Sequence, residues 1–149
     1  MSPISQTESL EALNQIAAAN REMADRVRAP GWYSWSLSLM LGGLAAVQEL
    51  PLTYVFAYEA VFFVALAFLV RAYKRKAGVW IPGYRAGRTR WVAVGSAVVY
   101  AVVFIGSYYI DHELGVRGAC IAGGVLIAAL ARVHCHLWEK AYRRDLGVA

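Results

Sequence analysis

One carboxylate, Glu59, lies in the middle of a long apolar stretch that runs from Leu52 to Val70. If this stretch crosses a bilayer, an ionised side chain at that depth is costly, so Glu59 should face other helices and be paired or protonated. Its neighbours one helical turn away, including Val55 and Phe63, offer no counter-charge. No Lys or Arg lies near the middle of any apolar stretch of the sequence. We therefore expect a hydroxyl group to be its partner.

Tyr58 and Tyr100 are the candidate partners of Glu59, and together with Tyr54 they are the candidate walls of a site around it. In a functional interpretation, Glu59 exchanges a proton or binds a cationic substrate, and the aromatic rings line the site. In a structural interpretation, protonated Glu59 donates a hydrogen bond to a neighbouring helix or subunit and holds the two together. The sequence leaves both interpretations open.

The cysteines and histidines do not predict a metal site or a cofactor. Cys120 and Cys135 would lie about 22 Å apart on one helix, which is too far for a disulfide between them. His134 and His136 are two residues apart, so on a helix they point in different directions and do not share an ion. No histidine lies at membrane depth, which argues against haem bound inside a bundle. We expect neither metal nor cofactor.

A long basic segment, residues 71–91, separates the second apolar stretch from the third and contains no Asp or Glu. Lys and Arg at this position suit the phosphates of anionic lipids. The simpler role of such a loop, which is to fix the orientation of the helices in the membrane, already explains its charge. The residues predicted to hold lipid headgroups are Lys74, Arg75, Lys76, Arg85, Arg88 and Arg90.

Four apolar stretches predict the transmembrane helices that must position these residues, at 33–50, 52–70, 92–110 and 115–133. Each has nearly the 20 or so residues that cross a hydrocarbon core, and Trp and Tyr lie at their ends as in an aromatic belt. The links within each pair of helices are short, so the helices of a pair should be antiparallel neighbours. The predicted fold is all-α: an integral membrane four-helix bundle of two antiparallel hairpins within residues 32–138.

Composition supports a membrane protein with one domain. The chain has 149 residues, of which 59% are hydrophobic and 17% charged, with a mean hydropathy of +0.44 and a pI of about 9.4. Its basic residues lie in clusters between apolar stretches, which favours anionic lipid headgroups over nucleic acid as the partner. Fourteen of the 15 Lys and Arg residues fall on one predicted side, with Arg117 as the exception. This asymmetry predicts that both termini lie in the cytoplasm.

The N-terminal segment, residues 1–31, is predicted to form a cytoplasmic amphipathic helix, and residues 139–149 a cytoplasmic tail. The helix either lies on the bilayer or against the ends of the bundle, or it docks a partner protein. Its apolar residues recur at steps of three and four, which gives one modest stripe made of Leu10, Leu13, Ala17, Ala24 and Val27.

Small residues recur at four-residue spacing in three of the predicted membrane helices. Such stripes let helix backbones approach closely. Packing within the chain is the simplest use of them, and at least one stripe is available for a subunit interface. The three stripes are Ser38, Gly42 and Ala46; Ala93, Ala97 and Ala101; and Cys120, Gly124 and Ala128.

Three segments together resemble a group of small four-helix membrane proteins that are common in actinobacteria: Arg28 to Tyr33, Gln48 to Pro51, and Gly78 to Arg90. The resemblance implies a helical bundle in a bacterial plasma membrane and implies no substrate. The chain is also similar in gross features to the small multidrug resistance transporters, which are short four-helix proteins with one embedded Glu. Their Glu belongs to the first helix, whereas Glu59 belongs to the second, so no activity is transferred.

The leading hypothesis is a non-catalytic accessory or oligomerising subunit of a membrane complex, present as a homo-oligomer or within a larger assembly. One alternative is a small proton-coupled transporter of a cationic or hydrophobic substrate that uses Glu59. A second alternative is a membrane enzyme that acts on lipid. The sequence contains no P-loop, nucleophile motif or acid pair, so the enzyme is the weakest of the three hypotheses.

Overall fold

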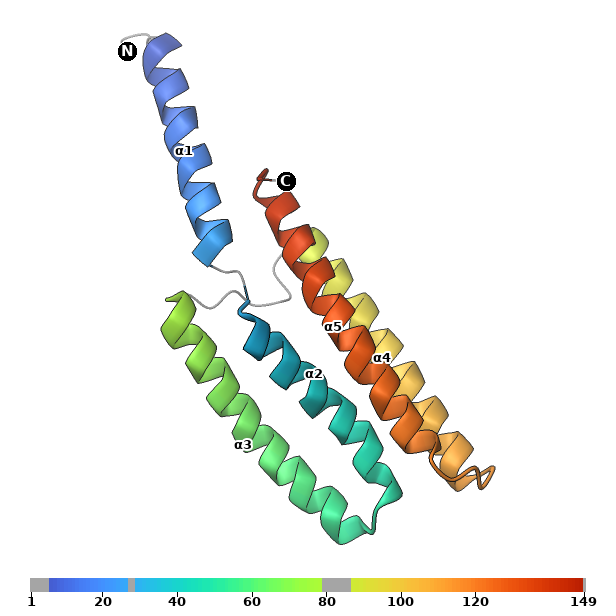
Figure 1. Ribbon diagram of the computed structural model, residues 1–149. Coiled ribbons are helices and arrows are strands. Elements are labelled where there is room, and N and C mark those ends of the chain that lie inside the picture. Colours follow the sequence, from blue (N-terminus) through green and yellow to red (C-terminus); the bar gives the residue numbers. More distant parts are fainter. Residues whose placement is uncertain (1–5, 27–28, 79–86, 149) are drawn as a thin grey trace.

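The computed structural model describes residues 6–26, 29–78 and 87–148, and within these ranges it is all-helical (Figure 1). The predicted all-α class is therefore confirmed. Residues 79–86 of the basic loop, including Arg85, lie outside the described residues. The helices are α1 (Gln6–Arg26), α2 (Gly31–Ala46), the 3-10 turn η1 (Val47–Glu49), α3 (Leu52–Ala77), α4 (Arg88–His112) and α5 (Ala119–Asp145).

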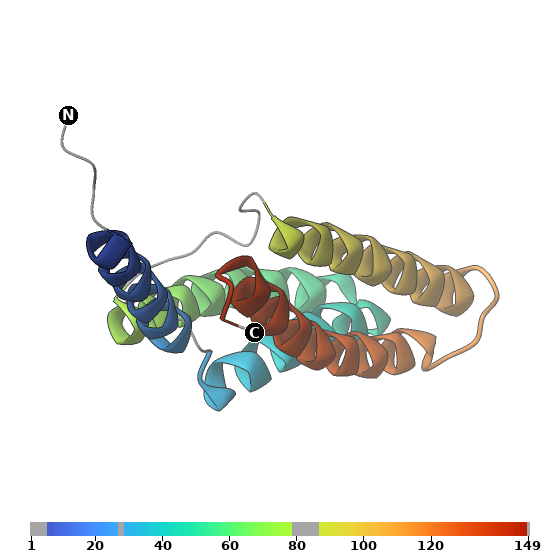
Figure 2. The ribbon, with the colours of Figure 1, turned by 90° about the horizontal axis from the view of Figure 1, so that it is seen from above.

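The two predicted hairpins are present, α2 with α3 and α4 with α5, and they join through α2 and α5. Helix α5 packs along both α2 and α4, whereas α3 packs mainly on α2 and η1. In Figure 1, α3 lies on one side of α2, and α5 lies on the other side with α4 behind it; Figure 2 shows the same helices from above. The α3–α4 pair is not among the packed helix pairs of the described residues. The helices therefore form an incompletely closed bundle.

Three helices are long and apolar enough to cross a membrane, as judged by length and composition: α3, α4 and α5. Helix α2 has 16 residues and falls short of that length by itself. Its apolar stretch continues into the 3-10 turn, which ends at Glu49. The structure thus supports three membrane-length helices and a shorter apolar one.

Small residues let α2 and α5 approach until their backbones nearly touch. A methyl group added at Gly42 would lie 2.5 Å from the carbonyl oxygen of Gly124 and 2.8 Å from the Cβ of Ala128. One added at Gly124 would lie 2.5 Å from the carbonyl oxygen of Gly42 and 3.0 Å from the Cβ of Ala46. Two of the three predicted stripes therefore pack against each other, as close packing of small residues requires.

The third stripe, on α4, is used differently. Ala97 and Ala101 are exposed, and Ala93 is half-buried. The face of α4 that contacts α5 instead carries Ser96, Tyr100 and Ser107. Gly123 of α5 allows this contact, because an added methyl group there would lie 2.5 Å from the Cβ and Oγ of Ser107.

Several helix ends differ from the predicted spans. The fourth predicted span begins at residue 115, but α5 begins at Ala119 because Gly115 and Gly118 have φ of +70° and +90°, conformations outside a right-handed helix. Helix α5 then continues to Asp145, through much of the predicted tail. Helix α3 continues to Ala77, where Gly78 ends it in a left-handed conformation and donates its N–H to the Lys74 carbonyl over 2.9 Å.

Helix α1 is present as predicted and projects away from the other helices beyond the C-terminal end of α5 (Figure 1). Asn20 donates a hydrogen bond to the carbonyl oxygen of Leu146 over 3.2 Å. Arg143 pairs with Asp25 at 3.2 Å. Leu10, Leu13 and Ala17 of the predicted stripe are exposed, whereas Ala24 is buried, so among the described residues only the first half of the stripe is uncovered.

Candidate functional site

The residues predicted to surround Glu59 are divided between two parts of the structure. Glu59 and Tyr58 are half-buried on α3, and Tyr54 on the same helix is exposed. The Tyr58 hydroxyl donates a hydrogen bond to the carbonyl oxygen of Met40 on α2 over 2.9 Å. Gly43 makes room for that hydroxyl, since a methyl group there would collide with it. Tyr58 thus joins α3 to α2.

Tyr100 belongs to the other hairpin. It lies on α4, and its ring meets the ring of His134 on α5 edge-on, with centroids 6.1 Å apart and planes at 77°. Its hydroxyl is buried, with no hydrogen-bond partner among the described residues. Because α3 packs on α2 and α4 packs on α5, the structure does not bring Tyr100 to Glu59. Glu59 lines neither the cavity between α4 and α5, nor the one between α2 and α3, nor the one at the basic end of the helices.

His134, Cys135 and His136 lie within the continuous helix α5, so the two histidines face different neighbours as predicted. His134 Nδ1 is hydrogen-bonded to the hydroxyl of Ser96 on α4. Together with Tyr100 it lines a shallow, mostly apolar cavity of about 300 Å³ between α4 and α5. His136 instead lines a larger cavity at the same end of the helices.

That larger cavity, of about 690 Å³, is the most polar one described and lies at the basic end of the helices. It is bounded by the start of α2, the end of α3, and α5. Residues before α2 and Asp25 of α1 complete it. Its cationic lining residues are Lys76 and Arg132, its acidic ones are Asp25 and Glu139, and His136 lines it as well. We call it the basic-end cavity. A third, shallow cavity of about 640 Å³ between α2 and α3 is lined mainly by apolar side chains such as Leu39 and Phe68.

Arg132 is held in place by α2. Its guanidinium donates a hydrogen bond to the Ser34 hydroxyl and lies 4.7 Å from the centroid of the Trp35 ring. The Ser34 hydroxyl in turn donates to the Gly31 carbonyl over 3.0 Å. An arginine over a tryptophan face is worth about 0.5–1 kcal/mol at exposed sites and more when water is excluded. These contacts fix a planar cation at the wall of the cavity.

Two further features favour an anion in the basic-end cavity. Helix α2 begins there with Pro30 at its N-cap, no capping side chain and no acidic residue in its first turn. Pro30 and Gly31 line the cavity, so the uncapped start of α2 and the positive end of its dipole lie at the cavity wall. The two acids of the cavity are drawn toward Arg143, which lies 3.2 Å from Asp25 and 3.5 Å from Glu139.

The residues predicted to hold lipid headgroups are distributed around this end. Lys74, Arg75 and Lys76 form the last turn of α3, where positive charge suits the negative end of the helix dipole. Of these, Lys76 lines the cavity. Arg88 and Arg90 lie at the start of α4, and both are exposed.

Positive charge is unfavourable at a helix start, and Asp145 of α5 offsets it at α4. Its Oδ2 accepts hydrogen bonds from the backbone N–H groups of Arg88 (3.0 Å) and Thr89 (3.4 Å). Gly87 makes this approach possible, because a methyl group there would lie 2.5 Å from the same oxygen. The end of α5 is thus anchored to the start of α4.

Arg132 and Ser34 were not predicted to act together, because 98 residues separate them. The available signal was Arg132 at the end of the last apolar stretch, together with the pair Trp32 and Trp35 at the start of the first. A cation and aromatic rings that leave a bilayer on the same side are natural neighbours.

At the opposite end, two acidic residues cap α5. Oε1 of Glu49, in η1, accepts a hydrogen bond from the backbone N–H of Gly118 over 2.8 Å. Oδ2 of Asp111, near the end of α4, accepts one from the N–H of Cys120 over 3.3 Å. Carboxylates at a helix start satisfy orphan donors and complement the dipole. The acids of the two short turns therefore tie both hairpins to one helix start.

No family model, no curated protein and no solved structure matches this chain. The chemistry of its sites therefore rests on the geometry described above.

Proposed function

We propose that this chain is a four-span membrane protein that acts as a non-catalytic subunit, and that the outer faces of α3 and α4 are covered by a further copy of the chain. The observation that carries the proposal is the small share of these helices that the chain covers by itself. Within their membrane-length windows, 17% of the residues of α3 and 6% of those of α4 are buried, against 28% for α5.

The fourth span is α2 continued by η1. Sixteen α-helical residues rise about 24 Å and three 3-10 residues about 6 Å, which together match the 30 Å of a hydrocarbon core. Helix α2 lies between α3 and α5 in Figure 1 and runs alongside both. If its two neighbours cross a bilayer, α2 crosses it too.

Association between helices in lipid depends on close packing, because lipid tails are as apolar as the side chains they would replace. The alanine stripe on α4 is a surface of that kind. Ala97 and Ala101 are exposed, while the equivalent stripes on α2 and α5 are packed against each other. A second copy that packs on α4 gains the same close contact that holds α2 to α5.

Orientation follows from charge in this proposal. The basic-end cavity and the basic residues that follow α3 face the cytoplasm of a bacterial plasma membrane, and the Glu49 and Asp111 caps face outward. Both termini are then cytoplasmic, and the exposed apolar residues of α1 contact the bilayer surface or a partner.

The test is the mass of the purified protein in lipid nanodiscs or mild detergent, by native mass spectrometry. We expect a species heavier than the 16.4 kDa single chain. The double variant Ala97→Leu with Ala101→Leu should lower the oligomeric fraction about tenfold. Ala129→Leu, at an exposed alanine of α5, is the matched control and should leave it unchanged. A single-chain mass at every concentration would defeat the proposal, as would equal effects of the two kinds of variant.

A second function, binding of an anionic lipid headgroup, is favoured by one specific observation: Arg132 and the uncapped start of α2 face the same cavity. The phosphate of such a lipid would accept hydrogen bonds from the guanidinium and from backbone N–H groups. Lys76 adds positive charge at the rim.

The measurement for this second function is the amount of phosphatidylglycerol retained by the purified protein. Arg132→Gln should release bound lipid, whereas Arg144→Gln, which removes the same charge from an exposed position of α5, should not. Equal retention by both variants, or equal loss, would show that the cavity does not select the headgroup.

A further inference from the structure

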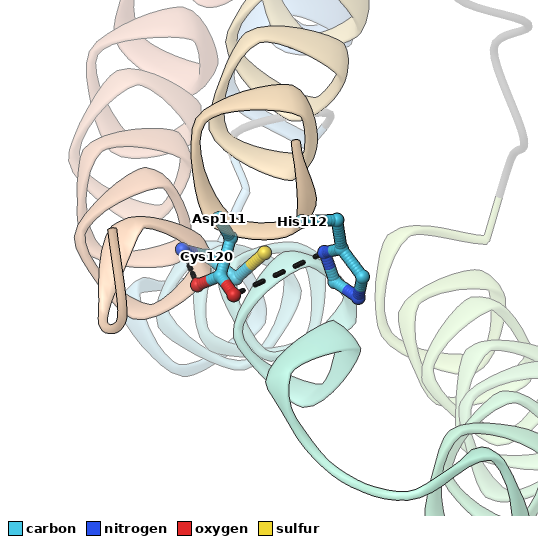
Figure 3. Close-up of side chains that lie close together, drawn as sticks. All are labelled: Asp111, His112 and Cys120. Atoms are coloured by element: carbon cyan, nitrogen blue, oxygen red, sulfur yellow. Dashed lines mark hydrogen bonds and ion pairs between the residues drawn. The ribbon is translucent and has the colours of Figure 1, made fainter. Parts of the chain in front are cut away.

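The turn between α4 and α5 brings together three side chains that commonly bind metals. They are Asp111 and His112, at the end of α4, and Cys120, in the first turn of α5. Their ligand atoms all lie within 4.8 Å of one another. Figure 3 shows the three side chains converging on one side of the turn.

The individual contacts hold these groups in place. Nδ1 of His112 lies 3.9 Å from Oδ1 of Asp111. The His112 ring is stacked on the ring of Tyr108, with centroids 4.1 Å apart and planes at 14°, so its plane is fixed. The Cys120 thiol is buried, donates a long hydrogen bond of 3.8 Å to the carbonyl oxygen of Ser107, and also interacts with the Asp111 carboxylate.

Glu49 has a carboxylate oxygen whose role has not yet been assigned. Oε1 of Glu49 caps Gly118, two residues before Cys120, but Oε2 of the same carboxylate is buried and has no hydrogen-bond partner among the described residues. A buried carboxylate oxygen left without a donor is costly. A cation beside it removes that cost. The carboxylates of Glu49 and Asp111 both act electrostatically on the Cys120 thiol, which places them near the sulfur.

We propose that Asp111, His112 and Cys120 form a binding site for a divalent transition-metal ion of the zinc type, with a fourth position open to water. One sulfur, one imidazole nitrogen and one carboxylate oxygen make a mixed set that zinc accepts in tetrahedral geometry. Bond lengths of about 2.0–2.3 Å place the ligand atoms of such a site about 3.3–3.7 Å apart. The ligand atoms must therefore approach one another by about 1 Å, which side-chain rotations achieve without a change of fold.

The site has a way in and a way to lose its proton. The His112 side chain is 39% exposed and Asp111 11%, so an ion reaches the buried thiol past the imidazole. On binding, the metal–sulfur bond replaces the S–H bond, and the proton leaves to solvent.

The simpler view is that Asp111 and Glu49 serve only as caps of α5. A capping role explains Oδ2 of Asp111 and Oε1 of Glu49, each of which accepts a backbone N–H. It explains neither the convergence of His112 and Cys120 on Asp111 nor the unpaired oxygen of Glu49. The metal and the caps are also compatible, because the Asp111 carboxylate has one oxygen for each role.

The experiment is a titration of the purified full-length protein with Co²⁺, followed by Zn²⁺ competition, with the sulfur-to-cobalt charge-transfer absorption as the readout. We expect one equivalent bound and the sulfur band present. Cys120→Ser should abolish the band, and His112→Ala should weaken binding at least tenfold. The matched controls, Cys135→Ser and His136→Ala, should bind as the unaltered protein does.

A second measurement guards against misfolding of Cys120→Ser, whose side chain is buried. His112 is exposed, so His112→Ala should fold, and its melting temperature should fail to rise when Zn²⁺ is added, while that of the unaltered protein rises. Absence of binding to the unaltered protein would overturn the proposal. Loss of the band in Cys135→Ser with retention in Cys120→Ser would overturn it too, because the ion would then lie at the other end of α5.

Discussion

Replacement of Gly124 by alanine tests the central contact of the fold. The added methyl group would lie 2.5 Å from the carbonyl oxygen of Gly42 and 3.0 Å from the Cβ of Ala46, and both atoms belong to the helix α2. Non-bonded carbon contacts are optimal at about 3.5–4.0 Å, so α2 and α5 must separate by about 1 Å. Rigid helix backbones cannot yield locally as a flexible side chain can.

Two terms set the size of the effect. Overpacking of a close contact costs about 1–3 kcal/mol, and a radial gap of that size forfeits a quarter to a half of the dispersion energy along the contact. Against this, alanine is a better helix former than glycine by about 1 kcal/mol. Gly106→Ala is the matched control, because a methyl group at that position of α4 meets nothing within 4 Å. The control isolates the helix-propensity gain.

We therefore expect Gly124→Ala to be less stable than Gly106→Ala by about 1–3 kcal/mol. At about 2–4 °C per kcal/mol for a chain of this length, the melting temperatures should differ by about 2–12 °C. Thermal unfolding in one detergent, followed by circular dichroism, measures the difference. Equal melting temperatures for the two variants would refute the close approach of α2 to α5 and with it the order of helices described above.

Glu49→Gln should lower the free energy of unfolding by about 0.5–2 kcal/mol because it weakens the charged cap on Gly118. Its control is Glu113→Gln, at an exposed position of the turn between α4 and α5, whose stability should lie within about 0.5 kcal/mol of the unaltered protein in the same unfolding assay. Tyr58→Phe should cost about 0.5–1.5 kcal/mol through loss of the hydrogen bond to α2, and a normal melting temperature would show that this bond contributes nothing. Glu59→Gln removes a carboxylate from the membrane-length helix α3 and should leave the oligomeric mass unchanged. Loss of proton flux in vesicles of Glu59→Gln, if the unaltered protein shows such flux, would instead favour the transporter hypothesis.

The helices themselves were predictable from local sequence. Apolar stretches of membrane length and the prolines at positions 30 and 51 gave α2 and α3 nearly their observed starts. The start of α5 was placed four residues early, because Gly115 and Gly118 are apolar in composition yet take left-handed conformations. Composition alone does not reveal such a turn. The hydropathy of a stretch and its backbone conformation are separate properties.

Contacts between distant parts of the chain were not predictable in the same way. The small-residue stripes were visible, but four-residue spacing does not say which stripe meets which, and α4 carries one as regular as those of α2 and α5. The Glu49 cap joins residues 69 positions apart, and Arg132 contacts Ser34 of α2, which lies 98 positions away. From the sequence, a carboxylate in a turn predicts only an outward-facing charge. Its capping role becomes visible only when the helix start beside it in space is known.

Glu59 illustrates the same limit from the other direction. Its position in an apolar stretch was clear, and the expectation of a tyrosine partner followed from the lack of any nearby cation. The packing order places α2 beside α3, so Tyr58 reaches Met40 and Tyr100 reaches His134. Depth in the membrane is encoded by position along one helix, whereas side-by-side placement is encoded by packing between helices.

The strongest reason to expect a partner is that the stripe of small residues exposed on α4 is of the same kind as the stripes that pack α2 against α5. In water, an apolar helix face is buried by the hydrophobic effect, but in lipid that driving force is absent and association requires close approach. The pair α2 and α5 achieves this with Gly42 facing Gly124. Helix α4 has the small residues for a similar contact at Ala97 and Ala101, and the other described residues leave both alanines exposed. A second copy would supply a matching surface by symmetry, since a two-fold contact needs only one self-complementary patch.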